Sequence, residues 1–286
     1  MKRYLLFIIL IICETAFTQE KLSDLKGPYL GQKPPVKKAV LFAPNVIKYE
    51  VHGSPSISQD RKEIIIDSMD EGVKYYKMID GIWSLQKELP FNIPGACNGI
   101  FISPSGRKIY LLVWINGNEH FYFCEKRNEQ WTTPCLLGEE VKTSASTWQF
   151  TSAKNENLYF SFNGKIVVSI FKNNTHLKPV PLILENKNEF EGGTPFIAPD
   201  ESYLIFNIRK EKASDLYISY KLKNNTWTKP IDLGLSINKK GKMDMCPIIS
   251  PCGKYLFFIS RRNGPDFQVF WADAGFVEEL KPAELK

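Results

Sequence analysis

Five stretches of the chain share one order of hydrophobic and polar residues. Each starts with a short apolar run, passes through a polar turn, and continues as a second run rich in β-branched and aromatic residues. The stretches are SISQDRKEIII (56–66), FISPSGRKIYL (101–111), FTSAKNENLYF (150–160), FIAPDESYLIF (196–206) and IISPCGKYLFF (248–258). They align without a gap, and the pattern predicts two antiparallel strands joined by a tight turn in each.

The turns recur at a nearly constant distance along the chain. Taken at Gln59, Pro104, Ala153, Pro199 and Pro251, successive turns are 45, 49, 46 and 52 residues apart. A third β-rich run follows in every repeat, and a fourth short segment completes the first four, most clearly at 128–138 and 224–234. Four short antiparallel strands per repeat of this length are typical of a β-propeller blade.

The fifth repeat ends after its third strand, because residues 274–286 contain no fourth segment. The stretch AVLFAPNVI (39–47), ahead of the first repeat, has the Leu-to-Pro spacing that is expected of one, with Leu41 and Pro44. We therefore expect it to form the outer strand of the last blade and close the ring, which removes exposed sheet edges. The prediction is an all-β, five-bladed propeller over residues 38–286; six blades would need a repeat that is not found.

The stretch ISPCGKYLFFISRRNGPDFQVFWAD (249–273) resembles the repeat of TolB-like (WD40-like) β-propellers. Blades of that family carry a Ser-Pro-Asp-Gly turn, an aromatic second strand, a loop with Arg and Gly, and an Asp-Ile-Tyr third strand. The resemblance covers the chain after residue 18 and is weakest in the third repeat, which has Ala153, Lys154 and Asn155 at its turn. It implies the fold rather than an activity, because propellers host binding, scaffolding and several chemistries.

The amino terminus has the features of a secretory signal. Two basic residues precede an apolar run to Ile12, which is too short to cross a bilayer, and polar and small residues follow. We expect cleavage after Thr18, a linker at 19–37, a secreted or periplasmic protein and no later transmembrane segment. A lipoprotein signal with a lipidated Cys13 is the alternative, which the preceding Ile12 disfavours.

Charge and composition narrow the possible partners. The 37 Lys and Arg residues against 31 Asp and Glu give a net charge of +6, and loss of residues 1–18 leaves 35 against 30, or +5. With no basic run longer than two residues, a nucleic-acid partner is not expected. The aromatic content of 13% is expected to fill the space between blades, at Phe101, Tyr110, Phe121, Tyr159, Phe206, Tyr217, Phe257 and Phe270.

Five cysteines remain after the predicted signal, at positions 97, 124, 135, 246 and 252, without a CxxC pair or zinc-like spacing. We expect buried or half-buried free thiols. The alternative is a pairing of Cys124 with Cys135, which flank a predicted hairpin symmetrically.

Candidate site residues fall on one face of the predicted ring. The segments that enter the first strands should lie there, beside the loops that join strands two and three. Seven residues before each turn position stand His52, Cys97, Ser146, Gly192 and Asp244, which should ring the mouth of the central channel. His52, Glu191 and Asp244 could anchor a sugar, a peptide end or a cation such as Ca²⁺, or could simply bond strand ends and channel waters. No other cofactor is expected.

The adjoining loops add an aromatic residue and two arginines. Trp114, in VWINGNEH, could stack on a sugar ring or a partner surface, or pack within its loop. Arg209 lies near Asp215, and Arg261 lies near Asp266. The recurrence suggests structural ion pairs, with ligand contacts as the alternative.

These features favour a non-catalytic binding or scaffold module. Its partner would be a protein or an envelope glycan, held by the face that bears His52, Trp114, Glu191, Arg209, Asp244 and Arg261. The alternative is a carbohydrate-active enzyme, a glycoside hydrolase or lyase-like, with Glu191 and Asp244 as its carboxylate pair at the channel mouth. Signatures of an enzyme are few: the chain has three His and no glycine-rich phosphate loop.

Overall fold

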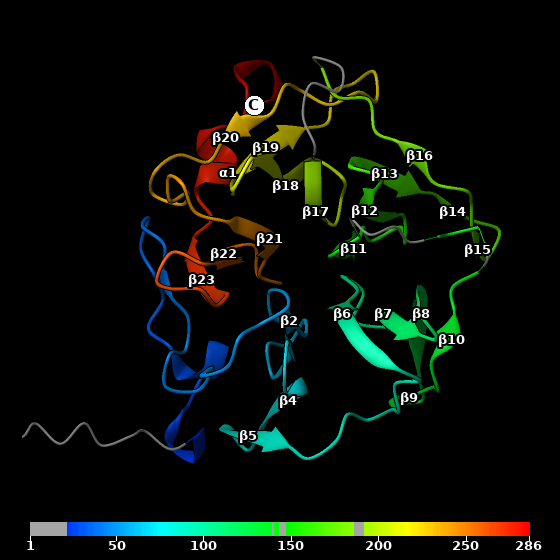
Figure 1. Ribbon diagram of the computed structural model, residues 1–286, viewed down its shortest axis with the longest axis vertical. Coiled ribbons are helices and arrows are strands. Elements are labelled where there is room, and N and C mark those ends of the chain that lie inside the picture. Colours follow the sequence, from blue (N-terminus) through cyan, green and yellow to red (C-terminus); the bar gives the residue numbers. More distant parts are fainter. Residues whose placement is uncertain (1–21, 139, 143–146, 186–191) are drawn as a thin grey trace, which may run out of the picture.

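A computed structural model describes residues 22–138, 140–142, 147–185 and 192–286. Five antiparallel sheets stand around a central axis like the blades of a propeller (Figure 1). Each blade contains four strands, which follow the order of the sequence in the first four blades, while the fifth takes its outer strand from the amino-terminal segment. The predicted all-β, five-bladed propeller is therefore confirmed.

The blades follow the chain. Blade 1 contains β2 (Ser56–Ile57), β3 (Glu63–Ser68), β4 (Gly72–Ile79) and β5 (Ile82–Gln86). Blade 2 contains β6 (Ala96–Ile102), β7 (Lys108–Ile115), β8 (Asn118–Arg127) and β10 (Cys135–Leu136), with β9 (Gln130–Trp131) on the end of β8. Blade 3 contains β11 (Phe150–Ser152), β12 (Leu158–Phe162), β13 (Lys165–Ser169) and β16 (Val180–Pro181), beside the small hairpin of β14 (Phe171–Lys172) and β15 (Thr175–His176). Blade 4 contains β17 (Gly192–Ile197), β18 (Tyr203–Lys210), β19 (Ala213–Tyr220) and β20 (Ile231–Asp232).

Blade 5 joins the two ends of the chain. It contains β21 (Asp244–Ile249), β22 (Tyr255–Ser260) and β23 (Gln268–Asp273), and its outer strand is β1 (Val40–Leu41). In this pairing Val40 lies opposite Trp271 and Leu41 opposite Phe270. The prediction that the amino-terminal segment closes the ring is confirmed.

The recurring aromatic residues pack between blades. Phe121 of blade 2 meets Phe150 and Phe160 of blade 3 edge-on, with ring centres 5.0 and 5.1 Å apart, a favourable geometry for aromatic pairs. Of the eight aromatic residues expected in this role, all are buried except Tyr217, which is half-buried. Most of the aromatic content is therefore core.

Both ends of the described chain pack against the propeller. Residues 22–37, expected to form part of a linker, contain the short turns η1 (Leu22–Asp24) and η2 (Tyr29–Gly31), and Leu25, Tyr29 and Leu30 are buried beside blades 1 and 5. The indole Nε1 of Trp83 donates to the Gly27 carbonyl at 2.7 Å, which fixes the segment on blade 1. This stretch is thus part of the folded unit.

The carboxyl-terminal residues lie against blade 4. They form α1 (Phe276–Glu279) and η3 (Ala283–Leu285), and the Tyr220 hydroxyl donates to the Val277 carbonyl at 2.6 Å. Within the described residues, no helix has the length and apolar character needed to cross a membrane. The predicted signal at 1–18, including Cys13, lies outside the described residues.

The five described cysteines are free thiols. Cys135 stands opposite Phe123 in the pairing of β10 with β8, so it shares a sheet face with Phe123 and not with the adjacent Cys124. Cys124 is buried and Cys135 is exposed. The thiols are free as expected, but Cys135 and Cys252 are exposed rather than buried or half-buried. The side chains of Cys124 and Cys135 do not face each other.

Candidate functional site

The propeller has two faces that differ in the loops they carry. The pairing of Ala96 with Trp114, Gly192 with Ile208 and Asp244 with Ser260 places the start of each first strand beside the loop between strands two and three. We call this side the loop face. The opposite side, which carries the turns between strands one and two, is the turn face.

His52 lies on the loop face in a small polar cluster. Its ring stacks on Trp148 with 5.1 Å between ring centres and an angle of 12°. Its Nδ1 stands 3.6 Å from Oδ2 of Asp67, and neither atom has a hydrogen-bond partner among the described residues. A cavity of about 20 Å³, also lined by Asn98 and Gln149, adjoins the pair. It has room for about one water molecule.

Burial determines the protonation of this cluster. It raises the pKa of Asp67, whose side chain is almost fully buried, from 3.8 to about 7. Burial also lowers the pKa of His52, against a smaller opposing effect of a backbone hydrogen bond with Asn98. It raises the pKa of the nearby Cys97 thiol as well. His52 and Cys97 therefore favour their neutral forms at neutral pH, and Asp67 favours its neutral form below about pH 7.

Asp244 is fully buried, with an exposure of 0%. Its Oδ1 accepts from Nη2 of Arg262 at 2.7 Å, and its Oδ2 accepts from the backbone N–H of Lys239 at 2.7 Å. The same Arg262 Nη2 donates to the Ile237 carbonyl, so the network joins the loop before blade 5 to the blade itself. Both carboxylate oxygens of Asp244, a predicted ligand anchor, are thus bonded within the fold. Glu191, the other member of the predicted carboxylate pair, lies outside the described residues.

The two arginines have different partners from those expected. Arg261 pairs with Glu50 at 3.0 Å and stacks on a phenylalanine ring, while Asp215 pairs with Lys210 at 2.7 Å rather than with Arg209. Arg261 therefore bridges blade 5 to the segment entering blade 1, and Arg209 is exposed. The predicted ion pair of Arg261 with Asp266 was wrong, although Arg261 does form a structural ion pair, with Glu50.

Trp114 stands at the end of β7 with 47% of its surface exposed. It is free of the core, as a contact residue would be. The structure does not bring it together with His52 and Asp244 in one cavity, because the loop-face cavity is lined by Trp148 instead.

The larger cavities open on the turn face. The channel mouth is a cavity of about 330 Å³ to which all five blades contribute, through Ile57, Phe101, Lys154, Phe196 and Ile248 among others. Ile57, Phe101, Phe196 and Ile248 belong to the buried first strands and make its lining predominantly apolar, while Lys154 comes from the exposed turn after β11.

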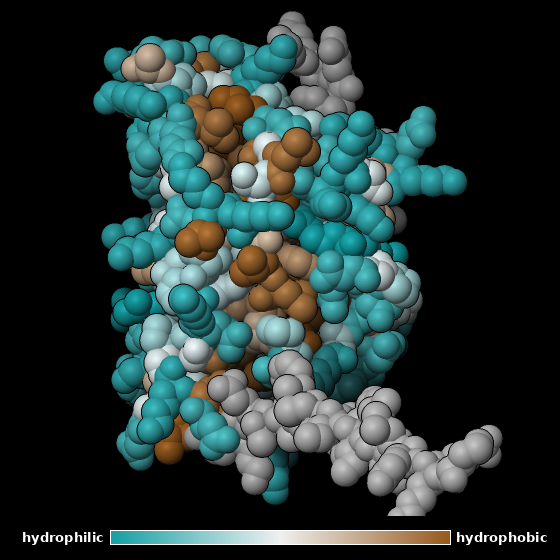
Figure 2. Space-filling model, turned by 90° about the vertical axis from the view of Figure 1, so that its left-hand side faces the viewer, coloured by the Kyte–Doolittle hydropathy of each residue, from teal (hydrophilic) through white to brown (hydrophobic). Residues whose placement is uncertain are grey.

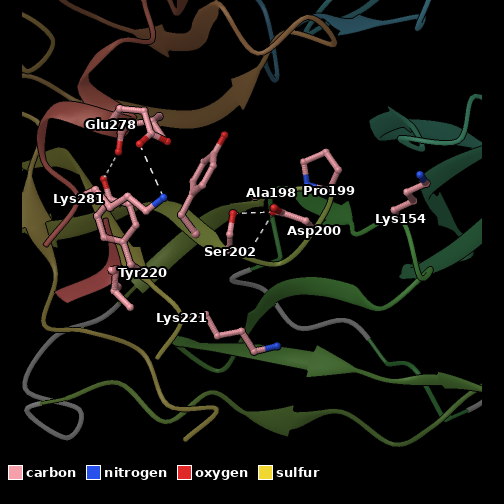
Figure 3. A pocket seen from close by; sticks show the side chains of 12 residues that line it. Lys154, Ala198, Pro199, Asp200, Ser202, Tyr220, Lys221, Glu278 and Lys281 are labelled. Atoms are coloured by element: carbon pink, nitrogen blue, oxygen red, sulfur yellow. Dashed lines mark hydrogen bonds and ion pairs between the residues drawn. The ribbon is translucent and has the colours of Figure 1, made fainter. Parts of the chain in front are cut away.

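A second cavity of about 690 Å³ lies between blade 4 and the carboxyl-terminal residues (Figure 3). We call it the cleft. Figure 3 shows Lys154 at one end and Glu278 and Lys281 at the other, with Tyr220 beside the helix. Lys154, Pro199 and Tyr203 line both the cleft and the channel mouth, so the two cavities adjoin on the turn face, and we call the pair the turn-face groove.

Reasoning from the sequence missed this groove. It directed attention to the loop face, and the residues that line the groove fell in positions assigned to turns and to core strands. Lys154, where the sequence departs from the turn of the family, lines both cavities of the groove. The cleft also depends on the packing of residues 276–285, which no repeat signal predicts.

The described residues contain no group of three or more His, Cys, Asp or Glu side chains that could hold a metal ion. A cation at the channel remains a prediction.

Comparison with known proteins was informative at the level of structure only. No family model and no curated protein matches the sequence. A solved structure, a putative TolB from Agrobacterium tumefaciens, superposes with a TM-score of 0.53 at 16% identity, over 77% of this chain and 76% of that chain. The chain has the fold of a TolB-like β-propeller. TolB from Acinetobacter baumannii gives a TM-score of 0.49 at 14% identity, over 77% of this chain and 56% of that chain.

One glycoside hydrolase family member is also similar in structure. The GH43 protein BlXynB from Bacillus licheniformis gives a TM-score of 0.50 at 10% identity, over 82% of this chain and 54% of that chain. The chain therefore spans little more than half of the GH43 protein and of TolB from Acinetobacter baumannii. At such identities the likeness concerns the fold.

Proposed function

We propose that this TolB-like propeller is a non-catalytic binding module that holds an extended segment of a partner protein in the turn-face groove. The observation that carries the proposal is that the channel mouth and the cleft adjoin and share Lys154, Pro199 and Tyr203 in their lining. An apolar cavity with a few polar groups, such as the channel mouth, is typical of ligand sites. The cleft adds charged side chains, among them Asp200, Lys221 and Glu278. A groove of two joined cavities suits a chain segment better than a compact small molecule.

The chemistry of the groove indicates what the segment would carry. At the channel mouth, Ile57, Phe101 and Phe196 offer apolar contacts, so an apolar side chain of the partner would lie there. Lys154 is exposed and its ammonium makes no ion pair with another described residue. An acidic residue of the partner would therefore be favoured next to the apolar one.

The carboxylates along the groove are engaged in local contacts. Asp200 accepts from the backbone N–H and hydroxyl of Ser202, at 3.0 and 2.6 Å, and Glu278 lies 3.7 Å from Lys281. Both carboxylates are thus held by side chains or backbone close to them in the sequence. The expected secretory signal supports a secreted or periplasmic partner.

The likeness to a GH43 protein supports a carbohydrate-active enzyme as the second candidate. It would use Glu191 and Asp244 on the loop face. Asp244 would first have to release both Arg262 and the Lys239 backbone, which makes this candidate the weaker one.

The proposal is tested by selecting binding peptides from a random library displayed on phage. The wild-type protein should select peptides with a shared motif of apolar and acidic residues. Lys154→Trp, which places a bulky ring where the two cavities meet, should lose these peptides. Lys172→Trp, an exposed lysine of blade 3 away from the groove, is the matched control and should retain them. Failure of the wild-type protein to select a motif, or equal binding by Lys154→Trp, would contradict the proposal.

A further inference from the structure

Two apolar side chains protrude from the outer wall of blade 5. Leu235 and Val36, exposed by 83% and 76%, are the most exposed large hydrophobic residues that the structure describes. They lie close together, because the backbone N–H of Ala39 donates to the Ser236 carbonyl at 2.9 Å. Figure 2 faces this side of the molecule and shows hydrophobic side chains among hydrophilic ones on its wall.

The conformation of the loop presents Leu235 to solvent. The backbone N–H groups of Ile237 and Asn238 both donate to the Gly234 carbonyl, at 3.0 and 2.8 Å, and close a tight turn. Ile237 and Asn238 are buried, so the turn is anchored while Leu235 stands at its tip. A rigid turn that exposes a leucine loses little conformational entropy when that side chain is buried elsewhere.

Lysines lie near the two apolar side chains in the sequence. Lys38 follows Val36 by two residues, and Lys239 and Lys240 follow Leu235 by four and five; all three are exposed and form no ion pair with another described residue. Glu279 pairs with Lys37, and Asp232 accepts only from neutral donors and so keeps its negative charge. Three unpaired lysines against Asp232 leave a positive excess in this part of the chain.

The charge of the whole chain is concentrated in this part of the sequence. Residues 209–243 contain nine Lys or Arg against three Asp or Glu, a surplus of six, which equals the formal charge of +6 for all 286 residues. The rest of the chain is balanced. Lys239 and Lys240 belong to this basic stretch, while its Lys210 and Lys221 pair with Asp215 and Glu201.

From this arrangement we infer that the outer wall of blade 5 docks on an anionic phospholipid bilayer, through a docking patch made of Val36, Lys38, Leu235, Lys239 and Lys240. Exposed aliphatic side chains enter the boundary between headgroups and acyl chains, and flanking lysines bind lipid phosphates. An acidic polysaccharide would satisfy the lysines but would leave Leu235 and Val36 in water, whereas a lipid surface offers both phosphates and an apolar boundary.

The test is flotation of the purified full chain with vesicles. Vesicles of phosphatidylcholine containing about 30% phosphatidylglycerol should carry the protein, and pure phosphatidylcholine vesicles should not. Lys239→Gln with Lys240→Gln should lower the partition coefficient at least about tenfold, since each lysine near such a surface contributes about fivefold. Leu235→Ser should lower it severalfold at unchanged charge.

Matched controls exist on blade 3, where exposed Leu177 lies between exposed Lys172 and Lys178. Leu177→Ser, and Lys172→Gln with Lys178→Gln, should leave flotation unchanged. The inference is overturned if the wild-type protein does not float, if it floats equally with neutral vesicles, or if the control variants lose as much as the patch variants. It is also overturned if Leu235→Ser converts a dimer in solution to a monomer without changing flotation, because a second copy would then be the occupant.

Discussion

Replacing Asp67 by asparagine should stabilise this protein at neutral pH, although it removes a charged group next to a histidine. The carboxyl group is nearly fully buried beside His52, its Oδ2 receives no hydrogen bond from described residues, and burial raises its pKa to about 7. Above that pH, folding has to bury a carboxylate that is not well compensated. An amide of the same shape avoids this cost.

The magnitude follows from the shift of the pKa. The unfolded chain ionises Asp67 near its ordinary value of 3.8, and the folded protein near 7, a difference of about 3 units. At about 1.4 kcal/mol per unit, this costs about 4 kcal/mol of unfolding free energy at pH 8, about 2 kcal/mol at pH 5, and close to nothing below pH 3. Because the pKa of Asp67 is higher in the folded protein than in the unfolded chain, the folded protein loses stability as the pH rises from about 4 to 7.

Urea denaturation at pH 5 and pH 8 measures the effect. Asp67→Asn should be more stable than the wild-type protein at both values, with the larger gain at pH 8. His52 titrates in the same range, but comparing the two proteins at each pH largely removes its contribution. Asp70→Asn, in the exposed turn that follows β3, should change neither stability nor its pH dependence. A loss of stability in Asp67→Asn at pH 8 would refute the reasoning, since the carboxylate would then be ionised and stabilised by a charged His52.

Three further predictions concern the fold. Asp244→Ala should cost about 3 to 5 kcal/mol of unfolding free energy in urea denaturation, because it leaves Arg262 buried without a counter-charge. Phe42→Ala, beside the closing strand, should cost about 3 to 5 kcal/mol in the same assay, since its ring is buried at 5.0 Å from Phe257. Thiol labelling followed by mass spectrometry should modify Cys135 in the native protein and Cys246, which is fully buried, only after unfolding.

Each of these has an outcome that would count against it. Asp215→Ala, which removes a pair with a half-exposed lysine, should cost only about 1 kcal/mol or less of unfolding free energy. An equal loss in both aspartate variants would mean that burial of the Asp244–Arg262 pair does not add to its effect. A Phe42→Ala protein of wild-type stability would mean that ring closure contributes little. Labelling of Cys246 at the rate of Cys135 in native buffer would show that the core of blade 5 opens readily.

Much of the fold could be predicted because each blade repeats one local pattern. Turns at nearly constant spacing locate the strands, and the missing fourth strand of the last repeat identifies the closing segment with Leu41. The packing of Tyr29 and of residues 276–285 could not be predicted in this way, since these segments occur once and their contacts depend on which blade they reach.

The candidate site could be predicted only in part. His52 is indeed near the channel on the loop face, because its distance from the turn is the same as in the other repeats. The burial of Asp244 could not be foreseen, since its partner Arg262 is 18 residues away and pairs with it only across the blade. The turn-face groove depends on space left between blades, which no spacing of residues encodes.

The affinity of one peptide selected by the wild-type protein, measured by fluorescence anisotropy, is the most direct test of the proposed function. We predict a loss of at least about tenfold for Lys154→Trp and no change for the variant with Trp114→Ala, Arg209→Ala and Arg261→Ala. The opposite result, with binding lost in the loop-face variant and kept in Lys154→Trp, would contradict the assignment of binding to the turn face.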